Sequence, residues 1–386
     1  MYQRNQSYIV DAKRTPIGKK GGWLSQIHPV DLGAYALNAL ISEHIENPDV
    51  IEDLIMGCVT QINQQGLNIA RNTILSAGLP ESIPGVTVDR QCGSSLQAIQ
   101  FACQGVEAGY YDVVLAGGVE SMSNVPLSSN ISSEASPLTA SISKRYSIKS
   151  GWFSQAKGAE LIAKKYNMSK MDLATFSYIS HRKAHESQKW FKNEIIPIMV
   201  DNNQTVDTDQ CIRPDTTPDK ILSLPDAFPG VEMINAGNSS QISDGASFTM
   251  ITSENGLKKI DSEPIAKISY FASIGTDPVT MLLGPINATH KLLERSGMKI
   301  DDFDCFEINE AFAPVPIAWQ KEFHVEDSRL NIFGGAIALG HPVGATGCRI
   351  LTTILNIMKI KRYHRGLIAI CEGGGMANAC IVEMLN

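Results

Sequence analysis

The feature that most constrains the fold is an alternation of short apolar stretches and amphipathic stretches along most of the 386-residue chain. Residues 7–12 and 111–118 are apolar runs typical of strands, whereas residues 29–45 repeat apolar side chains at the spacing of one helix face. Because alternating strands and helices build sheets that helices cover, this order predicts an α/β fold. A chain of this length is too long for one small core, so we expect two or three domain-sized units.

Composition and charge exclude several classes of protein. The net charge of −7 argues against a nucleic-acid binder, whose binding face would be basic. The chain has no apolar run of membrane-spanning length and no apolar segment after its first residues, so we expect neither a membrane span nor a secretion signal. The eight cysteines include no C-x-x-C pair, which predicts reduced thiols, a cytoplasmic location and no metal site.

Changes in composition divide the chain into three parts. Residues 1–120 are expected to form an N-terminal α/β half, which residues from about 236–263 complete. Residues 121–235 begin with a stretch rich in Ser, Asn and Pro and predict a loop-rich insertion that covers a substrate site. Residues 264–386 predict a C-terminal α/β half. A strand that ends in glycines occurs in this half as it does in the N-terminal half, which indicates an internal duplication.

Cys92 lies at a change of hydrophobic period. Val86 and Val88 alternate with polar residues, whereas Leu96 and Ile99 follow helical spacing, so a helix is expected to begin near Cys92. Free backbone N–H groups and the helix dipole favour an anion at such a position, which predicts a lowered thiol pKa and a nucleophile. The alternative is a buried structural cysteine.

His341 lies in a segment, residues 331–347, that contains five glycines and one proline. Glycines let the backbone approach a ligand closely, and the imidazole of His341 is suited to act as a base or as a hydrogen-bond donor. The alternative is a histidine that belongs only to the core. Neither of the common phosphate-binding glycine motifs occurs in this segment, so a nucleotide-binding loop is not expected.

Two further strand ends carry chemically useful groups. Asn309 follows an expected strand, and its amide is suited to hold a water or polarise an oxygen; the neighbouring Glu307 and Glu310 would alternatively cap a helix. Cys371 ends an apolar strand beside three glycines with free N–H groups, or else it only closes a buried strand. Together, these residues and the Cys92 and His341 segments suggest a nucleophile, a base, an acid and an oxyanion donor.

Four segments resemble the signature blocks of the thiolase family, in the family's order and over nearly the whole chain. They are V-D-R-Q-C-G-S-S at Cys92, N-E-A-F-A at Asn309, G-G-A-I-A-L-G-H-P-V-G-A-T-G at His341 and C-E-G-G-G at Cys371. The resemblance implies a five-layered αβαβα fold built from two duplicated α/β halves plus a loop-rich insertion. It also implies an acyltransferase that cleaves 3-ketoacyl-CoA reversibly with coenzyme A, through an acyl-cysteine intermediate.

The resemblance also implies a role for each of these residues. Cys92 would accept the acyl group, His341 would take the proton of Cys92, and Cys371 would protonate or deprotonate the acetyl α-carbon. A water held by Asn309, together with His341, would stabilise the enolate oxygen, and the N–H groups of Cys92 and Gly373 would stabilise the tetrahedral intermediate. The resemblance implies no metal and no permanently bound cofactor, since coenzyme A is a substrate.

Coenzyme A contacts follow from the same resemblance. Arg213 would lie near the adenine and its phosphates, and Ser240 would bond the pantetheine. The remaining residues of the pantetheine tunnel would be Ala236, Phe228, Ala311 and Phe312. The family also implies a homodimer or a homotetramer.

The choice of substrate follows from departures from the family pattern. Ser154-Gln155 stand where acetoacetyl-CoA enzymes of the family commonly carry His-Met, so we expect longer or bulkier acyl chains and a role in fatty-acid β-oxidation or related breakdown. The alternative is an acetoacetyl-CoA thiolase that condenses two acetyl-CoA molecules. A decarboxylating condensing enzyme usually has a second histidine where Cys371 stands, and a non-catalytic acyl-CoA or lipid-binding protein would not need the thiols.

Overall fold

The computed structural model describes residues 5–131, 136–148, 152–200, 204–227 and 229–385. The strands are β1 (Tyr8–Arg14), β2 (Gly18–Lys19), β3 (Asp53–Gly57), β4 (Gly85–Val88), β5 (Val113–Ser121), β6 (Ile198–Val200), β7 (Gln204–Val206), β8 (Ser243–Thr252), β9 (Ala266–Gly275), β10 (Cys305–Ile308), β11 (Arg365–Glu372) and β12 (Met376–Met384). The helices are α1 (Pro29–Ser42), α2 (Ile69–Ser76), α3 (Ser94–Glu107), α4 (Ala140–Tyr146), α5 (Gln155–Lys165), α6 (Lys170–Phe191), α7 (Pro218–Leu222), α8 (Glu254–Ile260), α9 (Gly284–Ser296), α10 (Pro314–Phe323), α11 (Ala336–Leu339) and α12 (Thr346–Lys361).

One long sheet runs through the molecule in the order β10-β11-β12-β9-β1-β8-β5-β3-β4, and β2 pairs with β8 beside this path. A single residue pair, Ile9 with Ala266, joins β1 to β9. The sheet therefore divides at this point into an N-terminal half, β4-β3-β5-β8-β1, and a C-terminal half, β9-β12-β11-β10.

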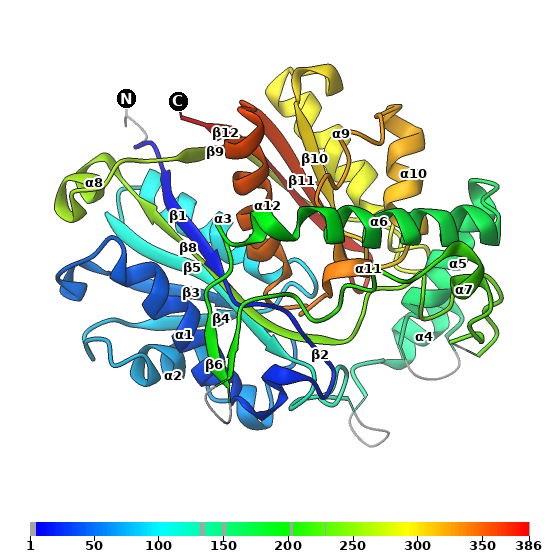
Figure 1. Ribbon diagram of the computed structural model, residues 1–386, viewed down its shortest axis with the longest axis horizontal. Helices are drawn as coiled ribbons and strands as arrows, with labels where there is room; N and C mark the ends of the chain where they lie inside the picture. Colours follow the sequence, from blue (N-terminus) through cyan, green and yellow to red (C-terminus); the bar gives the residue numbers. More distant parts are fainter. Residues whose placement is uncertain (1–4, 132–135, 149–151, 201–203, 228, 386) are drawn as a thin grey trace.

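Helices cover both faces of each half. The helices α3 and α12 contact each other and lie between the two halves, with strands of both against them (Figure 1). On the outer faces, α1 and α2 pack on the N-terminal half, while α9 and α10 pack on the C-terminal half. This arrangement confirms the predicted five-layered αβαβα fold.

The elements at the centre of the molecule are almost completely buried, polar side chains included. All residues of β5 and β8 are buried, as expected for strands with helices on both faces. In α12, every residue from Thr346 to Met358 is buried, because this helix lies between the two halves of the sheet and has no solvent face before its last turn.

The chain between β5 and β8, predicted to cover a substrate site, contains the helices α4 to α7 and the strands β6 and β7. Its longest element is α6, which begins at a capping box formed by Ser169 and Asp172 and packs on α7 and α11. The short strands β6 and β7 form a separate two-stranded sheet. None of the helices formed by the described residues has the length and apolarity needed to cross a bilayer.

Candidate active site

Cys92 lies in a tight turn between β4 and α3. Gln91 adopts a left-handed conformation with φ +50°, and its carbonyl accepts hydrogen bonds from the N–H (3.0 Å) and the Oγ (2.6 Å) of Ser94. The turn brings the thiol to the N-terminus of α3, as the change of period predicted. The Cys92 side chain is not freely exposed, since only 6% of the residue is accessible to solvent.

The prediction of a lowered pKa at Cys92 is wrong. Burial is the largest influence on the pKa of the Cys92 thiol and, with the negative charge of an ionised Glu372, raises it to about 12. The backbone N–H groups of Gly373 and Cys92 lower this pKa, but they do not outweigh burial. Cys92 is therefore a neutral thiol at rest and needs a base to become a nucleophile.

Cys371 lies at the end of β11 and is completely buried. Burial raises the pKa of its thiol well above the ordinary value, and the negative charge of an ionised Cys92 raises it further. The influence of Cys92 on this pKa indicates that the two thiols lie near each other. The turn that follows Cys371 holds Gly374 and Gly375 at φ +79° and +80°, a conformation that glycine adopts without strain.

The hydrogen bonds of His341 determine which ring nitrogen carries the proton. Thr346 Oγ1 donates its hydrogen to the carbonyl of Pro342 at 2.9 Å, so it accepts from His341 Nδ1 at 2.6 Å. The proton of the neutral ring is therefore on Nδ1, and Nε2 keeps its lone pair. The backbone N–H of His341 is itself fixed by Ser243 Oγ at 2.6 Å.

His341 is held neutral. Burial lowers its pKa to about 3, and the positive charge of Arg349 acts in the same direction. A neutral imidazole whose Nε2 carries no proton is able to accept one from a thiol, and this chemistry fits a site whose cysteines are protonated at rest.

Asn309 follows β10, and its backbone N–H donates to the carbonyl of Ala369 on the neighbouring β11 at 3.0 Å. Its side-chain Nδ2 lies 3.4 Å from His341 Nε2. Within the described part of the chain, the buried Oδ1 of Asn309 has no hydrogen-bond partner. Since a buried polar atom without a partner is costly, this oxygen is suited to bind a water or a substrate group.

Two buried carboxylates hold the histidine segment, and sequence reasoning missed this role for both. Glu120, at the end of β5, accepts hydrogen bonds from the N–H groups of Gly344 (3.0 Å) and Val59 (2.9 Å). Glu310 accepts from the N–H of Ile337 at 3.1 Å, at the start of the short helix α11 before His341. The only feature of the sequence that pointed to Glu120 was its position two residues after the glycine pair in β5.

A cavity of about 1010 Å³ opens onto Cys92, His341 and Gly373. Cys371 and Asn309 are buried and do not line it. Much of its remaining wall is apolar, and this wall includes the large side chains Leu127, Ile131, Trp152, Phe153 and Ile242. The structure thus brings the sulfur of Cys92 and the imidazole of His341 to a single apolar cavity.

The residues assigned to coenzyme A lie around two adjoining cavities. Ser240 and Phe312 line the first cavity, and the Ser240 N–H donates to the carbonyl of the buried Ala311 at 2.9 Å. Arg213 and Ala236 line a second cavity of about 490 Å³. Phe228 lies outside the described residues.

Gln241 lines both cavities and was not predicted. Its Oε1 accepts from Arg213 Nη2 at 3.1 Å, and its Nε2 donates to the carbonyls of Cys211 (2.8 Å) and Ile337 (3.0 Å). This amide therefore links the strongly basic side chain of the second cavity to the wall of the first.

The fold and this site define an acyltransferase that works through cysteine thiols. Comparison with known families identifies the kind: the chain belongs to the thiolase family, since the family model "Thiolase, N-terminal domain" matches residues 7–255 and "Thiolase, C-terminal domain" matches residues 262–384.

Relatives and solved structures agree with this assignment. A steroid 3-ketoacyl-CoA thiolase of Mycobacterium tuberculosis is 43% identical over 98% of this chain and 94% of its own length. A 3-ketoacyl-CoA thiolase of Bacillus subtilis is 36% identical over 98% and 99%. Among solved structures, the acetyl-CoA acetyltransferase of Bacillus anthracis matches with a TM-score of 0.91 at 30% identity over 100% of both chains. Human mitochondrial 3-ketoacyl-CoA thiolase matches with a TM-score of 0.88 at 32% identity over 99% of both.

Proposed function

We propose that the protein cleaves 3-ketoacyl-CoA with coenzyme A, giving acetyl-CoA and a shortened acyl-CoA, by a reversible reaction in acyl-chain breakdown. The observation that carries the proposal is that Cys92 and the unprotonated Nε2 of His341 lie at one cavity, while Cys371 is buried in β11, two residues before Gly373, which lines the same cavity. The named 3-ketoacyl-CoA thiolases among the relatives support the choice of substrate.

In the first half-reaction, His341 Nε2 takes the proton of Cys92 as the sulfur attacks the keto carbon. The bond between the keto carbon and the α-carbon then breaks, and the electron pair leaves as the enolate of acetyl-CoA. Cys371 gives its proton to the α-carbon of this enolate. The products are acetyl-CoA, an acyl group on Cys92, a Cys371 thiolate and a protonated His341.

In the second half-reaction, coenzyme A replaces acetyl-CoA. Its thiol gives its proton to the Cys371 thiolate and attacks the acyl carbon on Cys92. The Cys92 sulfur leaves and recovers its proton from His341, so both cysteines and the histidine return to their starting forms.

Negative charge develops on two different oxygens, so two sets of donors are required. The N–H groups of Cys92 and Gly373 serve the tetrahedral intermediate, and the influence of both on the pKa of Cys92 supports this assignment, because they already favour negative charge beside that sulfur. His341 and a water on Asn309 serve the enolate oxygen; the unpartnered Oδ1 of Asn309 supports a water there. Each donor of this kind supplies about 3 kcal/mol of transition-state stabilisation.

Coenzyme A would run from the second cavity into the first. Arg213 is exposed and offers its positive charge to the phosphates of the nucleotide, while Ser240, Phe312 and Ala236 stand along the way to Cys92. We further propose a cytoplasmic homo-oligomer that holds no permanent cofactor. The free thiol form of all eight cysteines supports a reducing compartment.

The preferred acyl groups would be long or bulky. Leu127, Ile131 and Trp152 line the first cavity although each is at least 36% exposed, so they present uncovered apolar surface to an acyl chain. The alternative is an acetoacetyl-CoA thiolase, and the likeness to the structure of an acetyl-CoA acetyltransferase supports this alternative. Thiolysis rates across a series of 3-ketoacyl-CoA chain lengths separate the two. Turnover of the four-carbon substrate alone would favour the alternative.

The acyl-cysteine is tested by incubation with acetyl-CoA and mass spectrometry of the peptides. We expect one acetyl group on the peptide that contains Cys92. Cys371→Ala should largely keep this label while it suppresses carbon bond cleavage, because Cys371 acts on the α-carbon and not on the acyl transfer. A label on another peptide, or a Cys371→Ala variant with full cleavage activity, would exclude this mechanism.

A further inference from the structure

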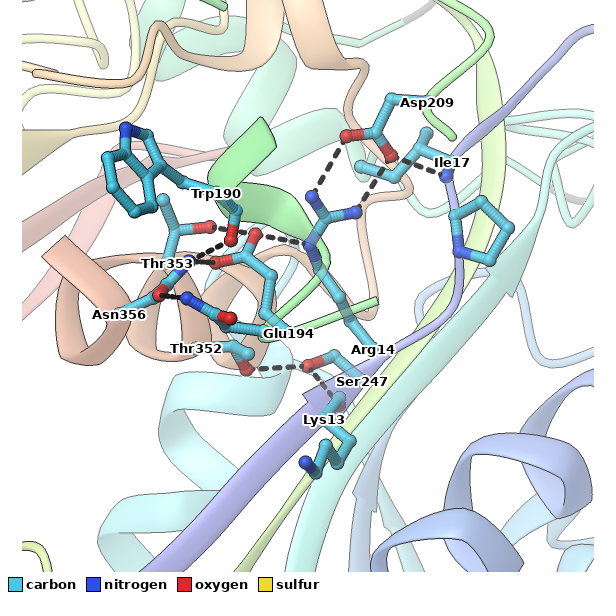
Figure 2. Close-up of polar contacts among 12 residues, drawn as sticks. Lys13, Arg14, Ile17, Trp190, Glu194, Asp209, Ser247, Thr352, Thr353 and Asn356 are labelled. Atoms are coloured by element: carbon cyan, nitrogen blue, oxygen red, sulfur yellow. Dashed lines mark hydrogen bonds and ion pairs between the residues drawn. The ribbon is translucent and has the colours of Figure 1, made fainter. Parts of the chain in front are cut away.

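A buried ion network joins β1 to the segment that carries Arg213. The guanidinium of Arg14, which is 0% exposed, donates to both carboxylate oxygens of Asp209 at 2.7 and 2.8 Å and to Glu194 at 2.7 Å (Figure 2). A charged side chain in the interior needs such pairing, because an isolated buried charge is strongly unfavourable.

The two carboxylates of this network hold different parts of the molecule. Asp209 Oδ1 also accepts the backbone N–H of Ile17 at 2.8 Å, which fixes Asp209 to the chain just after β1 (Figure 2). Glu194 instead accepts from Thr353 Oγ1 at 3.1 Å and Asn356 Nδ2 at 2.9 Å, so it ties the end of α6 to α12. Only Asp209 lies in the segment that leads to the second cavity.

Residues 207–213 form neither helix nor strand, and side chains hold this segment in place together with one backbone hydrogen bond, from the Gln210 N–H to the Ile17 carbonyl at 2.9 Å. Near its end, the carbonyl of Cys211 accepts from Gln241, and the N–H of Arg213 donates to His181 Nδ1 at 3.1 Å. Asp209 is the one acidic side chain of this segment that is buried. The pair with Arg14 is the one bidentate, charge-assisted attachment among these, and its two parallel bonds fix direction as well as distance.

We propose that Asp209 is a positioning residue for recognition of the coenzyme A nucleotide: held by Arg14 and Ile17, it fixes the segment from which Arg213 reaches the second cavity. The inference rests on the proposed binding of coenzyme A at Arg213. Asp209 itself contacts no substrate. It limits the range of positions available to Arg213, and a cation already in place loses less conformational freedom on binding.

The experiment compares acylation of Cys92 by acetyl-CoA and by S-acetyl-N-acetylcysteamine, which has the reacting thioester without the nucleotide. The ratio of the two second-order rate constants measures the benefit that the protein draws from the nucleotide. In Asp209→Asn, which keeps the shape but removes the charge, we expect this ratio to fall about tenfold while the rate with the short thioester stays near that of the unchanged protein.

Glu194→Gln is the matched control, since it alters the other carboxylate of the same buried Arg14. Its ratio should stay unchanged even where its melting temperature falls as much as that of Asp209→Asn. A purely structural role for Asp209 predicts instead that both variants lower the two rates together, and this result would overturn the inference. If Asp209→Asn does not fold, Asp209→Glu keeps the charge but displaces the segment, and an unchanged ratio in that variant refutes the proposal equally well.

Arg213→Ala separates this inference from the proposed function. If Arg213→Ala lowers the ratio and a folded Asp209→Asn does not, coenzyme A binds as proposed but Asp209 does not position its site. If Arg213→Ala leaves the ratio unchanged, the assignment of Arg213 to the nucleotide is wrong, and the role of Asp209 fails with it. Neither outcome affects the assignment of Cys92, which the acetyl label tests by itself.

Discussion

Replacing Thr346 by valine should disable the base without removing it. Thr346 Oγ1 accepts from His341 Nδ1 at 2.6 Å and thereby keeps the lone pair on Nε2. Valine has nearly the same shape but offers no acceptor, so a proton on Nδ1 would be buried without a partner, at a cost of about 1 to 3 kcal/mol. The ring avoids this cost by moving its proton to Nε2, and a protonated Nε2 can no longer take the proton of Cys92.

The magnitude follows from this penalty. Since each 1.4 kcal/mol corresponds to a factor of about ten, the rate of Cys92 acylation should fall roughly 5- to 150-fold. The assay is single-turnover acetylation of Cys92 from acetyl-CoA, followed by mass spectrometry. KM for coenzyme A should change little, because Thr346 lies behind the histidine and does not line either cavity.

Thr352→Val provides the control within the same helix. The Thr352 hydroxyl donates to the carbonyl of Cys348 at 2.8 Å, four residues back, just as Thr346 donates to Pro342 at 2.9 Å. The control loses the same kind of bond to a carbonyl four residues back, together with a contact to Ser247 Oγ at 3.1 Å, but it does not touch His341. An unchanged acylation rate in Thr346→Val, or an equal loss in Thr352→Val, would refute the assignment of the proton to Nδ1.

Three further predictions concern acidity and packing. Burial holds the pKa of His341 near 3, whereas its unfolded value is about 6.5. The unfolded chain therefore binds more protons as the pH falls from about 6.5 to 3, and the free energy of unfolding should decrease by about 1.4 kcal/mol per pH unit in this window. Urea unfolding should show that His341→Asn lacks this part of the slope. Gly344→Ala should lower the melting temperature, since a Cβ there would lie 2.6 Å from the Glu120 carboxylate and 2.6 Å from a backbone oxygen; unchanged melting would contradict the packing. Burial raises the pKa of Glu372 well above its ordinary value, so its charge acts on Cys92 only at a pH where Glu372 is ionised. In that range, Glu372→Gln should shift the pH profile of Cys92 alkylation by iodoacetamide to lower pH, because it removes a negative charge that raises the thiol pKa, and an unshifted profile would contradict this coupling.

Local patterns in the sequence predicted the family and the layers correctly. The alternation of strands and helices follows from side-chain periodicity, and each signature block keeps its reacting residue within a few positions of a strand end or helix start. Such features depend on residues that are neighbours in the chain, so they can be predicted from the sequence without the tertiary structure. The prediction that a helix begins near Cys92 was confirmed for the same reason, since α3 starts at Ser94.

The prediction of a low thiol pKa failed because it considered only the helix end. Removal of Cys92 from water raises its pKa more than two backbone N–H groups lower it, and the charge of Glu372 comes from the far end of the chain. The extent of burial is a property of the packed layers, so no local pattern around Cys92 encodes it.

The sequence by itself determined which residues are available for chemistry, where each stands on its strand or helix, and therefore the class of enzyme. Only the tertiary structure decided the protonation states and the positions of these residues. The bond from Gly344 to Glu120 joins residues 224 positions apart, and the pair of Arg14 and Asp209 joins residues 195 apart. Charge, burial and hydrogen bonding act through space, so the protonation of His341 and Cys92 and the placement of Arg213 depend on contacts that exist only after the halves and the chain between β5 and β8 have packed together.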